Sequence, residues 1–316
     1  MPGVADPVQR LVRGRPLTLM EVAPRDGLQN EPECLPTDAK LELIEGAIAA
    51  GLRRIEVASF VHPGRVPQMA DAEAVCARLP QRGDVRYTGL VLNRRGVERA
   101  IGTGRLQEVG MVVVASDRFG ERNQGMRIDA AVDEALRVFD AARAAGLDAQ
   151  VTIAVAFGCP FEGEVPRERV IELARRLAAA GPTEIALADT IGVADPAQVL
   201  DLFGAIRAEV GAEMPLRAHF HNTRGTGIAN AFAALQAGVE VLDASIGGIG
   251  GCPFAPRATG NIATEDLLYM LERMGVATGV SLPAVLDAAG RLSALLGREL
   301  PSMVGRAGGF PSPEAA

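Results

Sequence analysis

Short apolar segments alternate with longer helical segments along most of the chain. The apolar segments are rich in Val, Ile and Leu, as the buried strands of parallel sheets are. The segments between them are rich in Ala, Leu, Glu and Arg and carry apolar residues at helical spacing. The pattern predicts strands at 17–23, 54–58, 87–92, 108–115, 149–156, 184–188, 216–221 and 239–246. The predicted helices include 37–50, 94–102, 130–145, 167–180, 196–210 and 225–237.

This alternation predicts an α/β fold of the (β/α)8 TIM-barrel type, with eight strand–helix units in about 230 residues. An open, doubly wound sheet would show the same alternation, so the positions of the reactive side chains must decide between the two. A closed barrel brings the carboxyl ends of all its strands to one face, whereas an open sheet spreads them along an edge. Reactive side chains lie in or directly after several different strands: Arg25, Asp26, Glu56, Asp189, His219 and His221.

The barrel is expected to form one domain over residues 17–300. Two further helices, at 262–274 and 282–296, are predicted after the eighth strand and belong to this domain. Residues 1–16 are interpreted as an N-terminal leader and 301–316 as a flexible tail. At the helix boundaries, Thr37 and Asp129 are predicted N-caps, and four glycines are predicted to end helices: Gly51, Gly146, Gly181 and Gly238.

Composition and charge limit the classes of function. The chain has 316 residues, with 32 basic and 39 acidic side chains and a formal net charge of −7, which argues against nucleic acid or a membrane surface as a partner. No apolar run approaches the roughly 20 residues of a membrane span. The N-terminal segment lacks the apolar core of a secretory signal, and the four cysteines show no CxxC spacing. We therefore expect a cytoplasmic protein with reduced thiols.

Two of the three histidines, His219 and His221, lie at positions i and i+2 of a predicted strand. Both imidazoles therefore project to the same face, which suits two ligands of one metal ion. The third, His62, is interpreted as an ordinary core or surface residue. Asp26 at the end of the first strand is a candidate oxygen ligand, although an Asp there can also cap a turn. Mixed nitrogen and oxygen ligands favour Mg²⁺ or Mn²⁺ over Zn²⁺.

A Gly-rich segment follows the eighth strand, at residues 245–261. It lacks the GKS or GKT sequence of a P-loop and the spacing of a Rossmann turn, so a mobile lid is favoured over a phosphate cradle. Cys252 lies within it and could transfer a proton near neutral pH. The alternative is that Cys252 is a small buried apolar residue.

Six segments in the same order as in a known family carry a more specific signal. They resemble 3-hydroxy-3-methylglutaryl-CoA lyase, a member of the DRE-TIM metallolyases, and they span nearly the whole predicted barrel. The segments are EVAPRDGLQNE (21–31), EVASFVHPGRVPQMAD (56–71), FGCPFEGEV (157–165), ADTIGVADP (188–196), HFHN (219–222) and GGCPFAPRATGNIATEDLLYML (250–271).

The resemblance implies a set of roles for individual residues. The ligands of the divalent cation, Mg²⁺ or Mn²⁺, would be Asp26, His219, His221 and Asn261. Arg25 would stabilise the enolate oxygen of the acyl-CoA product, and Cys252 would transfer a proton. Glu56 and Asp189 would be supporting acids, with His219 or Asp189 as the base, and Ser59 would contact the substrate.

The activity implied is cleavage of a 3-hydroxyacyl-CoA, such as 3-hydroxy-3-methylglutaryl-CoA, to acetyl-CoA and a keto acid, by a homodimer. The chain departs from the family pattern HCHDTYGQ at Asn222, Arg224 and Thr226, and it has Ala186 where a serine is common. Arg224 and the lost acid are expected to make the mouth of the site more cationic and to suit a different carboxylate. His62 is an unusual residue that could affect substrate choice.

Three alternatives therefore remain open. One is a lyase for another thioester, such as citramalyl-CoA. A second is an enzyme that condenses an acyl-CoA with a keto acid, which the short segment after Met274 disfavours because it leaves little room for a regulatory domain. A third is a barrel that binds CoA or metal without catalysis, which the intact set of candidate ligands disfavours.

Overall fold

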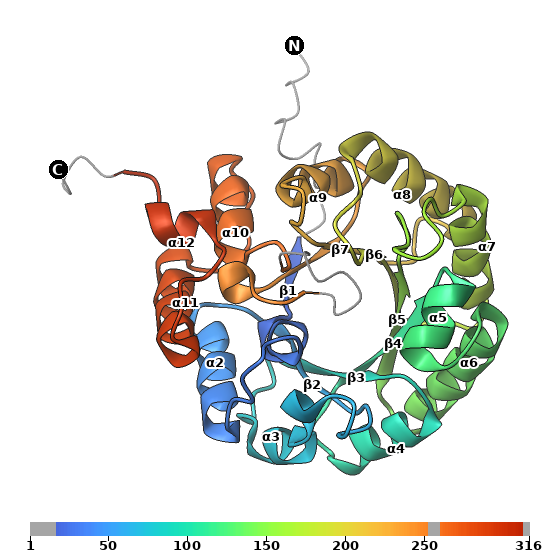
Figure 1. Ribbon diagram of the computed structural model, residues 1–316, viewed down its shortest axis with the longest axis horizontal. Coiled ribbons are helices and arrows are strands. Elements are labelled where there is room, and N and C mark those ends of the chain that lie inside the picture. The colour runs from blue at the N-terminus through green and yellow to red at the C-terminus, as the bar shows by residue number, and fades with distance from the viewer. Residues whose placement is uncertain (1–16, 252–259, 312–316) are drawn as a thin grey trace.

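The computed structural model describes residues 17–251 and 260–311. Eight parallel strands pair in sequence order, and β8 closes the sheet onto β1, so the predicted TIM barrel is confirmed (Figure 1). The strands are β1 (Thr18–Glu21), β2 (Arg54–Ser59), β3 (Arg86–Val91), β4 (Glu108–Val114), β5 (Asp148–Ala154), β6 (Glu184–Asp189), β7 (Leu216–Phe220) and β8 (Val241–Ala244).

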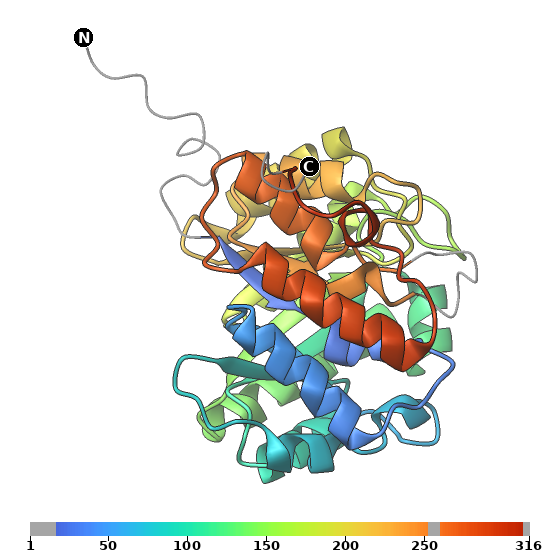
Figure 2. The same ribbon diagram turned by 90° about the vertical axis from the view of Figure 1, so that its left-hand side faces the viewer.

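Helices form a ring around the barrel. They are α2 (Thr37–Ala49), α3 (Ala72–Arg78), α4 (Arg94–Gly102), α5 (Asp117–Gln124), α6 (Ile128–Ala144), α7 (Arg167–Ala178), α8 (Pro196–Val210), α9 (Gly227–Gln236), α10 (Thr264–Arg273), α11 (Leu282–Leu296) and α12 (Met303–Ala307). Three short helical turns are η1 (Ala23–Gly27), η2 (Pro67–Met69) and η3 (Ile246–Gly248). The two predicted C-terminal helices are present as α10 and α11, and α11 packs beside α2 (Figure 2). No helix in the described ranges is long and apolar enough to cross a membrane.

Several local predictions need correction. Strand β1 ends at Glu21 and not at residue 23, because the carbonyl of Val22 accepts three amides that start η1. Helices α3, α5 and α12 were not predicted, since each has eight residues or fewer and so shows little helical periodicity. Helix α12 lies inside the predicted flexible tail, where Ser302 and Asp266 accept hydrogen bonds from its first amides. The predicted leader, residues 1–16, lies outside the described residues.

The helix-boundary predictions have mixed outcomes. Thr37 does not cap α2, because its hydroxyl donates to Asp71 at 2.6 Å, and Asp129 pairs with Arg176 at 2.8 Å instead of capping α6. The glycine predictions are confirmed by left-handed backbone just past the helix ends, with φ of +105°, +74°, +73° and +85° at Gly51, Gly146, Gly181 and Gly238.

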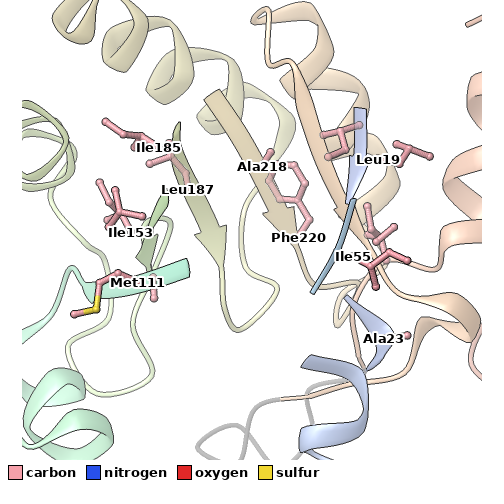
Figure 3. Close-up of a cluster of buried hydrophobic side chains, with 14 of the residues drawn as sticks. Leu19, Ala23, Ile55, Met111, Ile153, Ile185, Leu187, Ala218 and Phe220 are labelled. Atoms are coloured by element: carbon pink, nitrogen blue, oxygen red, sulfur yellow. The ribbon is translucent and has the colours of Figure 1, made fainter. Parts of the chain in front are cut away.

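The apolar core lies between the strands and the surrounding helices. Figure 3 shows part of this layer, in which alternate residues of neighbouring strands are fully buried, including Ile55, Met111, Ile153, Ile185 and Leu187. The other set of alternate residues points into the barrel. Many of these inward side chains are charged or polar, so the inside of this barrel differs chemically from its outside.

Buried ion pairs fill the lower part of the barrel, which is the part at the amino ends of the strands. Arg54 donates to Glu184 at 2.6 Å and to Glu108 at 2.9 Å, and Arg217 donates to Glu184 at 2.7 Å. Thr88 also donates to Glu108, at 2.8 Å. Glu108, Glu184 and Arg217 are at most 5% exposed, so each charge depends on its partner for stabilisation.

The substitution Glu184→Ala would remove one of the two buried carboxylates that pair with Arg54 and one of the two that pair with Arg217. We expect it to lower the free energy of unfolding by about 3–5 kcal/mol in urea denaturation, as removal of one member of a buried ion pair does. Asp201→Ala is the control, because Asp201 pairs with Arg167 on the surface at 2.5 Å, and the loss of an exposed pair is worth up to about 1 kcal/mol. Equal losses in the two variants would contradict the role given to the interior pairs.

Candidate active site

The turn η1 brings Arg25 and Asp26 to the carboxyl end of the barrel. It is a π-helical turn, with the amide of Gly27 donating to the carbonyl of Val22 at 3.1 Å. A Cβ atom at Gly27 would lie 2.7 Å from Cγ1 of Ile249, so only glycine allows η1 to approach the segment after β8 this closely. This approach places Asp26 next to the end of β7.

The end of β7 supplies the two histidines. Alternation points His219 and His221 into the barrel, while Phe220 between them packs against Phe157 in the outer layer, at 6.0 Å between ring centroids. The Nε2 atoms of the two histidines are 3.2 Å apart, and Nε2 of His219 is 3.9 Å from Oδ2 of Asp26. The ligand atoms of Asp26, His219 and His221 all lie within 4.8 Å of one another, so together they could hold a metal ion.

Asn261 completes this group from a distant part of the chain. The segment that carries it pairs with the end of β7, since the amide of Asn222 donates to Gly260 at 3.0 Å and the amide of Ile262 donates to Phe220 at 3.1 Å. Its Nδ2 donates to Asp26 at 2.9 Å and to the carbonyl of Ile249 at 3.1 Å. Its Oδ1 is buried and has no hydrogen-bond partner in the part of the chain that the structure describes. A free amide oxygen beside a carboxylate and two imidazoles fits a divalent cation with mixed ligands.

The protonation states of two of these groups also suit a cation. Burial opposes the ionisation of Asp26, but Arg25, the two histidines and Asn261 outweigh it and lower its pKa to about 2. Burial, together with the neighbouring charge of His219, lowers the pKa of His221 to about 4. At neutral pH, Asp26 is therefore an anion and His221 a neutral imidazole, which are the forms that bind metals.

Arg25 is held between two carboxylates. It donates to Glu56 at 2.5 Å through Nε and to Asp26 at 2.7 Å through Nη1. Burial raises the pKa of Glu56, against the lowering effect of Arg25. The predicted acid Glu56 thus fixes the Arg25 guanidinium beside the candidate metal ligands, where it can stabilise an anion.

Ser59 points into the barrel because β2 contains a bulge. The pairing of β2 with β3 shifts between Glu56 and Ala58, and this shift changes which alternate residues face inward. Phe60 consequently faces outward, against the position of Gly89. The Ser59 hydroxyl is buried and has no hydrogen-bond partner within residues 17–251 and 260–311, so these residues leave it available to a bound molecule.

Asp189 ends β6 and organises the loop that follows it. Its carboxylate accepts hydrogen bonds from the amides of Val193 at 2.9 Å and Ala194 at 3.0 Å. Burial raises its pKa despite these bonds and despite the nearby His219 and Arg224. A carboxylate with a raised pKa can accept a proton more readily than an ordinary one.

Two of the three residues that depart from the pattern after His221 donate hydrogen bonds to the loop that follows β6. Arg224 donates to the carbonyls of Ile191 at 3.0 Å and Gly192 at 2.7 Å, and Thr226 donates to Ala194 at 3.1 Å. Asn222 accepts a hydrogen bond from the amide of Gly227 at 3.1 Å. Arg224 is exposed, and its Nη1 atom is bound to the loop after β6.

Other predicted residues lie elsewhere. His62 is exposed, and its Nδ1 accepts a hydrogen bond from Gly64 at 3.1 Å within the loop after β2. Ala186 is fully buried inside the barrel wall. Cys252 and the central part of the predicted lid, residues 252–259, lie outside the described residues.

Solvent enters the barrel from its carboxyl end. Val112 and Thr152 point inward yet are partly exposed, whereas Gln150 one layer below is 1% exposed. The side chains of Arg25, Asp26 and His219 are 12–14% exposed at the same level. Toward the carboxyl ends of β3–β6 the inward side chains are mostly apolar, namely Leu90, Val112, Ala154 and Ala188, with Thr152 as a polar exception. The opening therefore has a charged half and an apolar half.

Sequence reasoning missed two residues that contact the candidate ligands or their partners. Asp243 on β8 lies 3.1 Å from Nδ1 of His219, and Arg217 on β7 contacts Asp243 from below. Arg217 precedes His219 by two positions and so shares its face of the strand, which was the one available signal. A charged residue inside an apolar strand indicates a buried partner, but the sequence does not say which one.

Known proteins resemble this chain over most of its length. The family model described as HMGL-like matches residues 16–291. An (R)-citramalyl-CoA lyase from Chloroflexus aurantiacus is 46% identical, covering 92% of this chain and 95% of the relative. The hydroxymethylglutaryl-CoA lyase YngG of Bacillus subtilis is 41% identical, covering 90% and 95%. A solved HMG-CoA lyase from Acinetobacter baumannii, in complex with coenzyme A and 3-methylmalate, superposes with a TM-score of 0.89 at 37% identity, covering 99% of this chain and 100% of that one.

Cation binding should stabilise the fold through His221. In a thermal melt, saturating Mn²⁺ is expected to raise the Tm of the wild-type protein, because an ion that binds the native state alone adds about 2.7 kcal/mol at a concentration of 100 times Kd. His221→Ala should largely lose this rise, since one ligand is gone. His62→Ala is the control and should keep it. An undiminished rise in His221→Ala would show that the ion binds elsewhere.

Proposed function

This chain belongs to the HMGL-like family, and from that premise we propose that it is a metal-dependent lyase that cleaves the carbon–carbon bond of a 3-hydroxyacyl-CoA. The first substrate we assign is 3-hydroxy-3-methylglutaryl-CoA, with acetyl-CoA and acetoacetate as products. One observation carries the assignment of a metal-dependent reaction. Asp26, His219 and His221 converge beside the free Oδ1 of Asn261, with Arg25 held next to them.

The residues that would hold the cation are Asp26, His219, His221 and Asn261. Two imidazoles and two oxygen donors, with no thiolate among these four, favour Mg²⁺ or Mn²⁺. When bound, the cation supplies Lewis-acid chemistry, lowering the pKa of the substrate hydroxyl and orienting the substrate.

His219 and Asp189 are the two candidates for the base that takes the hydroxyl proton. His219 has its Nδ1 engaged by Asp243 and its Nε2 among the candidate ligand atoms, so it has no free nitrogen. Burial raises the pKa of Asp189, which favours proton uptake, and its two carboxylate oxygens accept the amides of Val193 and Ala194.

The bond changes are those of a retro-aldol cleavage. As the hydroxyl loses its proton, C3 becomes a carbonyl carbon and the C2–C3 bond breaks. The electron pair moves to C2 and the thioester oxygen, where the Arg25 guanidinium can offset the negative charge. Cys252 is assigned to deliver a proton to C2, which completes acetyl-CoA, and the keto acid retains C3 and its substituents.

The charged half of the opening suits the hydroxyl and carboxylate of such a substrate, and the apolar half suits its methyl group. Arg25 and the candidate ligands lie on the charged half, where a hydroxyl and a carboxylate would bind. Ser59, at the carboxyl end of β2, offers a buried hydroxyl that has no partner among the described residues. The apolar side chains Val112 and Ala154 on the opposite wall suit the methyl group on C3.

A second substrate is favoured by a specific observation. The relative at 46% identity is named as an (R)-citramalyl-CoA lyase. Citramalyl-CoA differs from 3-hydroxy-3-methylglutaryl-CoA by one methylene, since its carboxylate is attached directly to C3, and the same cleavage would give acetyl-CoA and pyruvate. We keep a cytoplasmic location and a homodimer as further parts of this proposal, the latter by likeness to the family.

The test is a direct assay of both thioesters with purified protein, following acetyl-CoA and the keto acid. We expect cleavage of at least one substrate with Mg²⁺ or Mn²⁺, and a loss of at least about 100-fold in rate after EDTA, because a metal supplies several kcal/mol to such a transition state. Addition of the ion should restore the rate. Cleavage that persists unchanged in EDTA would contradict the metal-dependent mechanism, and no cleavage of either thioester would contradict the assigned substrates.

A further inference from the structure

A continuous series of ion pairs runs from the lower part of the barrel to His219. Arg54 donates to Glu184 at 2.6 Å, and Glu184 accepts from Arg217 at 2.7 Å. Arg217 also donates to Thr152 at 3.0 Å, and its Nη1 contacts Oδ2 of Asp243. The same Oδ2 lies 3.1 Å from Nδ1 of His219. Asp243 therefore links the buried ion pairs to the candidate metal ligands.

The direction of the bond between Asp243 and His219 follows from charge. Oδ2 of Asp243 contacts Nη1 of the Arg217 guanidinium, which can only donate, so this carboxylate oxygen is an acceptor in an ion pair. An ionised carboxylate can only accept hydrogen bonds, so Nδ1 of His219 must carry the proton and donate it. In the neutral ring, the lone pair is then on Nε2, which is the nitrogen that faces Asp26 and His221.

We propose that Asp243, held in place by Arg217, is the positioning residue that orients the ring of His219 for metal binding. The proposal rests on the metal site of the proposed function, and it assigns a role to two residues that do not themselves touch the ion. A carboxylate that accepts the far N–H of a metal-binding histidine fixes both its tautomer and its ring orientation.

The two histidines are supported differently. Nδ1 of His221 is buried and has no hydrogen-bond partner among the described residues. His221 is instead placed by the backbone pairing of its strand end with Asn261. His219 is thus the ligand whose orientation depends on a side chain, and removal of that side chain should weaken metal binding through His219 alone.

A second ion pair, which is partly buried and joins Arg207 to Glu240, provides a matched control variant. Glu240, three residues before Asp243, pairs with Arg207 at 2.7 Å, and the two side chains are 14–16% exposed. Glu240 also accepts a hydrogen bond from the amide of Leu216 at the start of β7, at the opposite end of that strand from His221. Loss of Glu240 should therefore destabilise the fold without changing the metal site.

The experiment compares Asp243→Ala, Asp243→Asn and Glu240→Ala with the wild-type protein. The Kd for Mn²⁺ is measured from the electron paramagnetic resonance of the free ion, and thermal melting reports stability. We expect Asp243→Ala to weaken Mn²⁺ binding by about 10–100-fold, as loss of such a partner does elsewhere. Glu240→Ala should bind Mn²⁺ like the wild type, even if its Tm falls as far. The visible spectrum of bound Co²⁺ should change in Asp243→Ala and not in Glu240→Ala.

Asp243→Asn covers the case in which the alanine variant does not fold. The asparagine keeps an oxygen acceptor for His219 and loses the charge, so its Kd should lie between those of the wild type and the alanine variant. Wild-type affinity and an unchanged Co²⁺ spectrum in the Asp243 variants would overturn the proposal while leaving the metal site intact. If the wild-type protein binds no Mn²⁺, the metal site of the proposed function fails and this proposal fails with it.

Discussion

Two ion pairs of the buried Arg217 guanidinium join the interior of the barrel to the candidate active site. A charge inside a barrel is stable only when it is paired and hydrogen-bonded, and Arg217 is paired with Glu184 below it and with Asp243 above it. The first pair joins it to the ion pairs that fill the lower barrel. The second leads directly to His219. The same contacts therefore stabilise the barrel and support the candidate active site, so changes to the interior charges should affect both.

The site combines segments that are far apart in the sequence, and backbone hydrogen bonds fix their positions. The π-helical turn after β1 supplies Arg25 and Asp26, the end of β7 supplies the two histidines, and a segment paired with that strand end supplies Asn261. Close approach is possible because glycines face these groups. A Cβ atom at Gly250, for example, would lie 2.5 Å from Nδ2 of Asn261. The charged half of the opening is built in this way, while small apolar residues on β3–β6 form the other half.

Sequence periodicity predicted the alternating strands and helices, because buried strands and amphipathic helices have different spacings of apolar residues. The positions of the reactive side chains then favoured a closed barrel over an open sheet. The spacing of His219 and His221 likewise placed both rings on one face. Only the family resemblance identified Asn261 as a candidate ligand, because its position depends on backbone pairing with His221 at the end of the barrel. The inward direction of Ser59 depends on a bulge that alternation does not reveal. The contact between Asp243 and His219 joins two strands, and a single sequence contains no information on such a pair.

The central claim is that these residues form a metal site at the carboxyl end of the barrel. The most direct test is anomalous X-ray diffraction from crystals of the protein grown with Mn²⁺. We expect one strong anomalous peak bound by Asp26, His219 and His221, with Oδ1 of Asn261 as a further ligand. A peak at another position, or no peak at this site when Mn²⁺ is present at saturating concentration, would contradict it.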